Sequence, residues 1–376
     1  MDAPPTAVPP EAVAAIRQRI LRWFDEEHRD LPWRSRRSEY GTVVSEFMLQ
    51  QTQVATVVPY FNAFLEQFPS FEALAEASEE DVLRAWSGLG YYRRARMLKR
   101  VAESVVRRHG GKLPRTREEL AELPGFGEYT VGAVGSIALG LPLPLVDGNV
   151  RRVIGRLFAL EEDLTRAVGR KKLWALSRAL VDPVRPGDFN EGLMELGATV
   201  CVPREPLCLV CPLFESCAAR ASGLPEAYPR PTPGMRIRQV REVAVVLVRK
   251  GRVLALQRGE TGAFAGMWEL PRLDSREIGI PENLTPDTVL FELARLRIGQ
   301  AAPEFLGSTR STFTHHVITT ELYRVELAAE RGPVRRQHHV AHRWLVPRSL
   351  HELPASRSQH KLFELVVESF KSGGAD

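Results

Sequence analysis

Hydrophobic residues recur at helical spacing along the first 220 residues of the chain. Between residues 11 and 28, apolar side chains stand three or four positions apart, which predicts an amphipathic helix. The same spacing predicts further helices over 43–61, 171–180 and 190–199. Because no segment before residue 225 alternates as a strand does, we expect residues 11–220 to form an all-α domain.

The pattern changes after a proline-rich stretch. Residues 221–238 are predicted to be a linker, since prolines stand at 225, 229, 231 and 233. Beyond it, the apolar runs 243–248 and 253–256 flank a Lys250-Gly251 turn, which predicts a β-hairpin. We therefore expect residues 239–370 to form a smaller α+β domain. Its other predicted elements are strands over 317–327 and 342–346 and helices over 289–298 and 360–370.

Length and composition bound the class of protein. The 376 residues suffice for two or three domains, and 44% hydrophobic with 26% charged residues is typical of a globular protein. Residues 1–10 are rich in proline and alanine and are expected to be a disordered tail. With neither a signal peptide nor an apolar run of membrane-spanning length, we expect a cytoplasmic monomer with no membrane partner.

The net charge of +5 permits a nucleic-acid partner without demanding one. Local basic clusters, within 93–100 and at Arg107-Arg108, are a stronger indication.

A short glycine-containing turn joins two apolar helical segments within residues 119–156. Its sequence, Leu123-Pro124-Gly125-Phe126-Gly127, predicts a helix–hairpin–helix in which Pro124 fixes φ and the two glycines can adopt positive φ. Backbone N–H groups uncovered at the start of the second helix would suit a DNA phosphate. From spacing alone, an ordinary helical hairpin remains an alternative.

Two acidic residues are candidates for chemistry. Asp147, in Val146-Asp147-Gly148-Asn149, stands where a helix is predicted to begin, and Glu46 stands near the start of the helix predicted over 43–61. Both positions also suit an acid for structural reasons, as an N-cap and as a first-turn charge. The residues alone leave both explanations open.

All four cysteines fall within residues 201–217, with the spacing C-x6-C-x2-C-x5-C. Four thiols this close in a chain without a secretion signal favour one metal centre over disulfides. Zinc sites usually pair two CxxC knuckles, whereas only Cys208 and Cys211 form one here. The spacing therefore favours a [4Fe–4S] cluster with zinc as the alternative. The predicted ligands are Cys201, Cys208, Cys211 and Cys217.

The hairpin, the aspartate and the cysteine loop occur in an order that resembles the helix–hairpin–helix DNA glycosylase superfamily, which includes endonuclease III. Within it, four stretches are similar to MutY-type adenine DNA glycosylases: SEFMLQQTQVATVVPYF (45–61), GLGYYRRAR (88–96), DGNVRRV (147–153) and FNEGLMELGATVC (189–201). The resemblance is dense over 11–220 and thinner beyond. It implies an all-α helix–hairpin–helix domain with an iron–sulfur loop, followed by a MutT-like (Nudix-fold) α+β domain.

The resemblance implies an activity on double-stranded DNA, in the bacterial nucleoid if the source is bacterial. These enzymes flip out and excise adenine mispaired with 8-oxoguanine or guanine. By resemblance, Glu46 protonates the adenine and Asp147 stabilises the cationic sugar, supported by Tyr129 and Asn149. The positions that match the adenine pocket are Trp33, Arg34, Leu49 and Glu191; those that match DNA-contacting residues are Gln51, Thr52, Tyr91, Gly125 and Gly127, with Gln51 and Tyr91 wedged into the base stack.

The chemistry requires two carboxyl groups in different states. Adenine leaves poorly until it is protonated, so one carboxyl must donate a proton near neutral pH, and burial can raise its pKa accordingly. The cation that develops at C1′ needs an ionised carboxylate opposite it, as in a retaining glycosidase.

Tyr129 also bears on the type of reaction. The superfamily's glycosylase-lyases place a lysine nucleophile at this position, and a tyrosine cannot form a Schiff base, which implies a monofunctional enzyme. The alternatives are a pyrimidine glycosylase-lyase, a catalytically silent damage-binding protein and a Nudix hydrolase.

The C-terminal domain is expected to bind rather than hydrolyse. Its recognisable patch is residues 266–271, but residues 290–299 hold one glutamate instead of the glutamate-rich metal-binding helix of Nudix hydrolases. In MutY-type enzymes a loop of pattern Phe-Ser-His reads 8-oxoguanine, and here it corresponds to Phe313, Thr314 and His315. Threonine keeps the hydroxyl of the family's serine.

Overall fold

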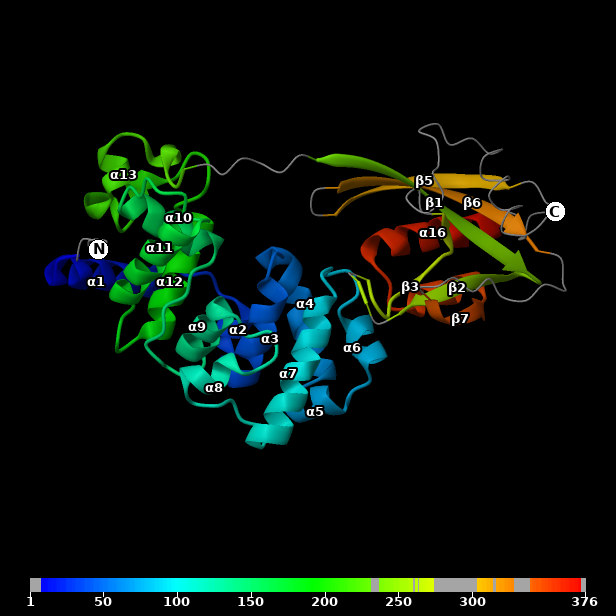
Figure 1. The fold of residues 1–376 in the computed structure, drawn as a ribbon, viewed down its shortest axis with the longest axis horizontal. Coiled ribbons are helices and arrows are strands. Elements are labelled where there is room, and N and C mark those ends of the chain that lie inside the picture. The colour runs from blue at the N-terminus through cyan, green and yellow to red at the C-terminus, as the bar shows by residue number, and fades with distance from the viewer. Residues whose placement is uncertain are drawn as a thin grey trace. The chain divides into compact units, whose positions relative to one another are not determined.

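The computed structural model describes residues 8–230, 237–259, 261–262, 264–273, 303–313, 316–327 and 339–372. Its contacts divide the chain into two compact units (Figure 1). The first unit contains Met1–Glu76 and Met97–Gly234, and the second contains Ala77–Arg96 and Met235–Asp376.

The first unit is helical, and residues 8–230 contain no strand, which confirms the all-α prediction. Its α-helices are α1 (Pro10–Glu27), α2 (Pro32–Ser35), α3 (Glu39–Leu49), α4 (Val54–Gln67), α5 (Phe71–Glu76), most of α7 (Arg93–His109), α8 (Arg117–Ala121), α9 (Glu128–Ile137), α10 (Gly148–Leu157), α11 (Ala167–Leu180), α12 (Pro186–Thr199) and α13 (Ala218–Ala221). Three 3-10 turns follow α12: η1 (Cys208–Val210), η2 (Phe214–Ser216) and η3 (Pro225–Ala227). None of the helices in the described part of the chain has the length and apolar character needed to cross a membrane.

The single helix predicted over 43–61 is wrong. The chain forms α3 and α4 instead, and the break contains Gln51, whose φ of 57° lies in the left-handed region. Glu46 consequently stands in the C-terminal half of α3, where the helix dipole disfavours a negative charge. The first-turn explanation of Glu46 is therefore excluded.

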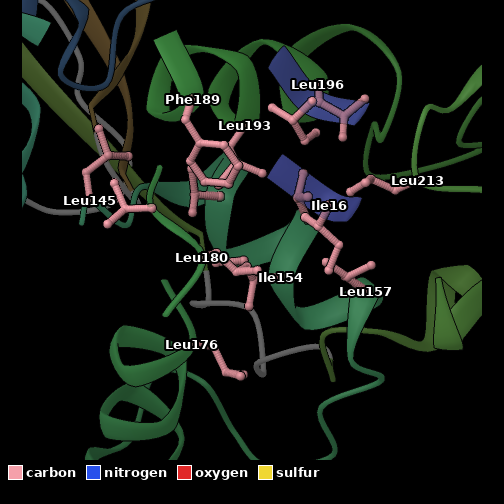
Figure 2. Packing of buried hydrophobic residues seen from close by; sticks show 14 of the residues in the cluster. Ile16, Leu145, Ile154, Leu157, Leu176, Leu180, Phe189, Leu193, Leu196 and Leu213 are labelled. Atoms are coloured by element: carbon pink, nitrogen blue, oxygen red, sulfur yellow. The ribbon is translucent and has the colours of Figure 1, made fainter. Parts of the chain in front are cut away.

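One apolar core joins the helices on which the cysteine loop rests. Figure 2 shows Ile16 of α1, Ile154 of α10, Leu180 of α11 and Phe189 of α12 pointing into this cluster, where all four are buried. Leu213, between η1 and η2, belongs to the same core, and three of the cysteines pack against it. Apolar packing therefore holds the cysteine loop against the helices without a contribution from a metal.

The second unit contains α6 (Glu79–Ala85), the start of α7 and a seven-stranded sheet of order β3-β2-β1-β6-β5, with β4 paired to β1 and β7 paired to β2. Strands β1 and β6 are parallel, and the other pairs are antiparallel. The bounds are β1 (Arg238–Arg249), β2 (Arg252–Arg258), β3 (Trp268–Glu269), β4 (Arg272–Leu273), β5 (Glu304–Phe313), β6 (His316–Glu326), β7 (His339–Leu345), η4 (Pro347–Glu352) and α16 (Arg357–Ser372).

The predicted hairpin is confirmed. Arg249 of β1 pairs with Arg252 of β2, and the turn residues Lys250 and Gly251 both have positive φ, as a tight hairpin requires. The strands predicted over 317–327 and 342–346 correspond to β6 and β7, and the helix over 360–370 to α16. The helix predicted over 289–298 lies outside the described residues.

Candidate active site

Glu46 is a buried carboxyl group with a neutral hydrogen-bond donor. Its side chain is 5% exposed, and the hydroxyl of Tyr129, from the first turn of α9, donates to its Oε2 atom at 2.7 Å. Burial raises the pKa of Glu46 to about 7. The hydrogen bond from Tyr129 lowers the pKa, and the negative charges of Glu191 and Asp147 raise it further. A carboxyl of this kind holds a transferable proton near neutral pH.

Asp147 occupies the N-cap of α10, as the sequence predicts. Its Oδ1 atom accepts from the Val150 backbone N–H at 2.6 Å, and its Oδ2 atom accepts from Nδ2 of Asn149 at 3.1 Å. Burial raises the pKa of Asp147, but these hydrogen bonds and the charge of Arg152 oppose the rise. Asp147 is therefore better suited to the ionised state than Glu46, whose carboxyl has the strongly raised pKa.

A hydrogen-bond network leads from Asp147 to the cysteine loop. Asn149, which donates to Asp147, accepts from Nη2 of Arg152 at 2.8 Å. The same guanidinium donates from Nε to the Cys201 carbonyl oxygen at 2.7 Å and from Nη2 to the Gly197 carbonyl oxygen at 2.6 Å. A side chain at Gly197 would place its Cβ 2.6 Å from Cβ of Asn149, so this glycine permits α10 and α12 to approach closely.

A chain of ion pairs surrounds the residues that match the adenine pocket. Nε of Arg34 donates to Oε1 of Glu191 at 2.9 Å, and its Nη2 donates to Oε2 of Glu195 at 3.0 Å. Glu195 also binds Arg29, and Glu191 forms a short ion pair with Arg37. Sequence reasoning missed Glu195, Arg29 and Arg37. The spacing of Glu191 and Glu195, four residues apart on one predicted helix, was the only available signal.

The other two residues that match the adenine pocket, Trp33 and Leu49, belong to α2 and α3. Trp33, in α2, is buried with its ring edge-on to Phe61 at 5.4 Å between centroids. Leu49, the last residue of α3, is half-buried, and the Thr52 backbone N–H donates to its carbonyl oxygen at 3.2 Å.

The hairpin between α8 and α9 forms as predicted, although only one of its two glycines has a positive φ, since φ of Gly127 is −79°. Gly125 has a φ of 77°, and a Cβ there would lie 2.3 Å from Cγ of Met97, so glycine is required. Gly127 is the N-cap of α9, with no side-chain cap, and a Cβ at this position would meet no atom within 4 Å. No side chain therefore caps the first backbone N–H groups of α9, and they are accessible to a phosphate.

The two predicted wedge residues share an unusual backbone. Gln51 and Tyr91 both have positive φ, 57° and 50°, and both side chains are exposed. Such strain at non-glycine residues is typical of functional sites. Phe313 ends β5, opposite His316 of β6, whereas Thr314 and His315 lie outside the described residues.

The four cysteines line one cavity in the loop that follows α12. Burial raises the pKa of the Cys211 thiol to about 12, and the neighbouring thiols add to the rise. Cationic groups share the cavity: Nη1 of Arg156 lies 3.4 Å from Sγ of Cys201, and Arg220 lines the wall. Four thiols around one cavity fit the donor set of a [4Fe–4S] cluster, in which each thiolate binds one iron atom.

Two family models match the chain. That of the HhH-GPD superfamily base excision DNA repair protein matches residues 44–179, and that of the NUDIX domain matches residues 243–365. With the helical and sheet architectures above, these matches confirm the predicted fold class, a helix–hairpin–helix domain followed by a smaller Nudix-fold domain.

Similarity to individual proteins extends further. The adenine DNA glycosylase of Homo sapiens is 37% identical over 409 residues, covering 94% of this chain and 74% of the relative. The adenine DNA glycosylase of Rattus norvegicus is 36% identical over 410 residues, covering 95% and 78%. Among solved structures, a thermostable thymine-DNA glycosylase is 30% identical, with a TM-score of 0.52, over 56% of this chain and 98% of that one.

Proposed function

The chain belongs to the adenine DNA glycosylase family, and from that premise we propose which mispair it repairs and which residues act. Membership makes it a base excision repair enzyme that hydrolyses an N-glycosidic bond. We propose that its substrate is adenine opposite 8-oxoguanine, or opposite guanine, in double-stranded DNA. We accordingly expect it in the cytoplasm, at the nucleoid if the source is bacterial.

The observation that carries the proposal is a pair of carboxyls in different environments, Glu46 buried and Asp147 half-buried. The flipped adenine enters a pocket formed by Trp33, Arg34, Leu49 and Glu191, and Glu46 donates its proton to the base. As the glycosidic bond breaks, ionised Asp147 stabilises the positive charge at C1′. Water then adds to C1′ to give the abasic sugar, and the Glu46 carboxylate, which has given its proton to the base, accepts the proton that this water releases. Tyr129 and Asn149 hold these two carboxyls through the hydrogen bonds at 2.7 and 3.1 Å.

The proposed reaction is glycosylase chemistry without a lyase step. The position at which lyases carry an amine is Tyr129, whose hydroxyl is already engaged with Glu46. Burial raises the pKa of Tyr129 well above its usual value, so its phenol stays protonated and makes a poor nucleophile.

The deciding assay is single-turnover cleavage of a duplex that holds one adenine opposite 8-oxoguanine. Strand breaks are expected only after alkali treatment, because excision alone leaves an intact backbone. Breaks without alkali would contradict the monofunctional assignment, and no abasic site at all would contradict the substrate.

We also propose that the cysteine loop holds a [4Fe–4S] cluster. Cys201, Cys208, Cys211 and Cys217 would be the ligands, and Arg156 would balance part of the cluster's negative charge. With all four thiolates engaged, the cluster would order the loop rather than hydrolyse anything.

Purified protein is therefore expected to be brown, with broad absorbance at about 400 nm from thiolate-to-iron charge transfer. Cys208→Ser should lower both this absorbance and the soluble yield, because the loop loses one ligand. Iron and zinc analysis of protein made with ample iron provides the check. Stoichiometric zinc without iron would establish the alternative metal.

The C-terminal domain is proposed to read the lesion through Phe313, Thr314 and His315. 8-Oxoguanine differs from guanine in an N7–H donor and an 8-oxo acceptor, and a threonine hydroxyl can bond to either.

Thr314→Val, which keeps the shape of the side chain and removes the hydroxyl, should lower the preference for 8-oxoguanine over guanine about 5–150-fold, equivalent to one polar contact. Thr312→Val, on the exposed side of β5, is the matched control and should leave the preference unchanged. Single-turnover rates on the two duplexes measure the ratio. If Thr314→Val keeps the original ratio, lesion reading lies elsewhere, for example with Gln51 and Tyr91.

A further inference from the structure

We infer that Glu195 is a positioning residue that fixes Arg34 in the adenine pocket, an inference that rests on the function proposed above. Glu195 lies one helical turn after Glu191 on α12, so both carboxyls face the same side. Its side chain is 2% exposed, and its pocket partner Arg34 is 9% exposed. A carboxylate so far from water needs several donors to stay charged, and this one has them.

The hydrogen bonds of Glu195 form a complete set. Oε1 accepts from Nε of Arg29 at 2.6 Å and from the Arg29 backbone N–H at 3.1 Å. Oε2 accepts from Nη2 of Arg29 at 2.9 Å and from Nη2 of Arg34 at 3.0 Å. Burial alone would raise the pKa of Glu195, but the bonds from Arg29 and the charge of Arg34 outweigh it and lower the pKa to about 2. Glu195 is therefore an anion throughout the physiological range.

Glu195 completes the fixation of the Arg34 guanidinium. Each of its three nitrogens has one partner: Nε donates to Glu191, Nη2 to Glu195 and Nη1 to the Arg29 carbonyl oxygen at 3.1 Å. The ring of Phe24 lies 5.2 Å from its central carbon. A planar group bonded along three edges cannot rotate, so the long arginine side chain is ordered before a base arrives.

Glu191 cannot supply this order by itself. Its second oxygen is engaged by Arg37, a side chain that is about one-third exposed and also pairs with Asp188 at 3.1 Å. Without Glu195, the Arg34 guanidinium would keep Glu191 and the Arg29 carbonyl oxygen as partners but lose the bond at Nη2, so its plane could tilt. When the groups that hold the adenine shift by an ångström, both the affinity for the base and the excision rate fall.

The test uses binding as well as rate. Glu195→Gln should lower the single-turnover excision rate about 100-fold, the usual cost of an ångström-scale displacement. It should also weaken binding of a duplex that carries uncleavable 2′-fluoro-2′-deoxyadenosine opposite 8-oxoguanine about tenfold, which corresponds to one hydrogen bond. Binding of a duplex with a tetrahydrofuran abasic site in place of the adenosine should be unchanged, because it offers no base to Arg34. A merely structural role would weaken both duplexes alike and would overturn the inference.

The matched control is Asp25→Asn. It removes the same charge from the same ion-pair network, but its partner, Arg185, forms its ion pairs with Asp25 and Asp188 rather than with Glu191 or Glu195. Asp25→Asn should leave both duplex affinities and the excision rate at the wild-type level. If Glu195→Gln does not fold, Arg29→Gln can replace it, because Arg29 is partly exposed and its removal takes hydrogen bonds away from the Glu195 carboxylate. This variant should show the same selective loss of binding to the adenine duplex, to a smaller degree.

Arg34→Gln separates this inference from the proposed function. If Arg34→Gln excises adenine normally, the proposed pocket is wrong. If Arg34→Gln is impaired while Glu195→Gln and Arg29→Gln are not, only the positioning role is wrong. The double variant Arg34→Gln/Glu195→Gln should be no worse than Arg34→Gln alone, because Glu195 acts through Arg34. Additive losses would show an independent role for Glu195.

Discussion

Glu46→Gln should bind a duplex with adenine opposite 8-oxoguanine and leave the adenine in place. Glutamine keeps the shape of the side chain and accepts the Tyr129 hydrogen bond at the same position, but it has no transferable proton. General acid catalysis is typically worth about 10²–10⁴-fold in rate, so the single-turnover rate should fall by that factor. Because Kd for the duplex is measured separately, loss of chemistry is distinguished from loss of binding. A rate within a few-fold of wild type would rule out Glu46 as the acid.

The pH profile offers a second measurement of the same group. The active form of Glu46 is protonated, and its pKa is raised to about 7. The rate should therefore be highest below pH 7 and fall about tenfold per pH unit above it, as long as the proton donor limits the reaction. A rate that stays constant up to pH 9 would contradict a general acid with this pKa.

The raised pKa of Glu46 also predicts that Glu46→Gln is more stable than the wild type. A carboxyl with a folded pKa of about 7 and an unfolded pKa near 4.5 destabilises the fold increasingly between those pH values, because the unfolded chain releases the proton more readily. Glu46→Gln removes a penalty on the order of 3 kcal/mol at pH 8, from 1.36 kcal/mol per pKa unit, and little at pH 4. Melting temperatures of the two proteins should therefore differ more at pH 8 than at pH 5.

Local patterns in the sequence were sufficient for the helices over 11–28, 171–180 and 190–199, the hairpin turn at Lys250-Gly251 and the N-cap role of Asp147. Each depends on residues close together in the chain, whose chemistry specifies the local backbone. The break at Gln51 was missed because the segment around it contains neither glycine nor proline, and glutamine is a good helix former. The chain turns there with a hydrogen bond from the Thr52 backbone N–H to the Leu49 carbonyl oxygen, which helix propensity does not predict.

The ion pairs around the candidate pocket could not be predicted in the same way. Arg29 and Glu195 are separated by 166 positions, and nothing in either local sequence selects the other. The resemblance to the glycosylase family identified Arg34 and Glu191, but it carries no information on which side chains hold them. The sequence likewise does not show that Arg152 connects Asn149 to the carbonyl oxygen of Cys201.

Asp147→Asn should be inactive for a different reason from Glu46→Gln. Asparagine can still accept from the Val150 N–H and cap α10, so the helix and the fold should persist. What disappears is the negative charge that faces the developing cation at C1′. Removing one preorganised electrostatic contact of this kind costs about 10²–10³-fold in rate, or about 3–4 kcal/mol of transition-state stabilisation.

The helix-capping explanation of Asp147 makes the opposite prediction, so the two can be separated. If Asp147 only capped α10, Asp147→Asn would be nearly neutral in both rate and melting temperature, since the two residues are equivalent N-caps. Asp147→Ser provides the matched control, because serine also caps but is shorter and uncharged. We expect both variants to keep the melting temperature and the affinity for the uncleavable adenine duplex, and both to lose excision. An Asp147→Asn enzyme that excises adenine at the wild-type rate would show that the carboxylate is a cap and that the charge at C1′ is stabilised by another group.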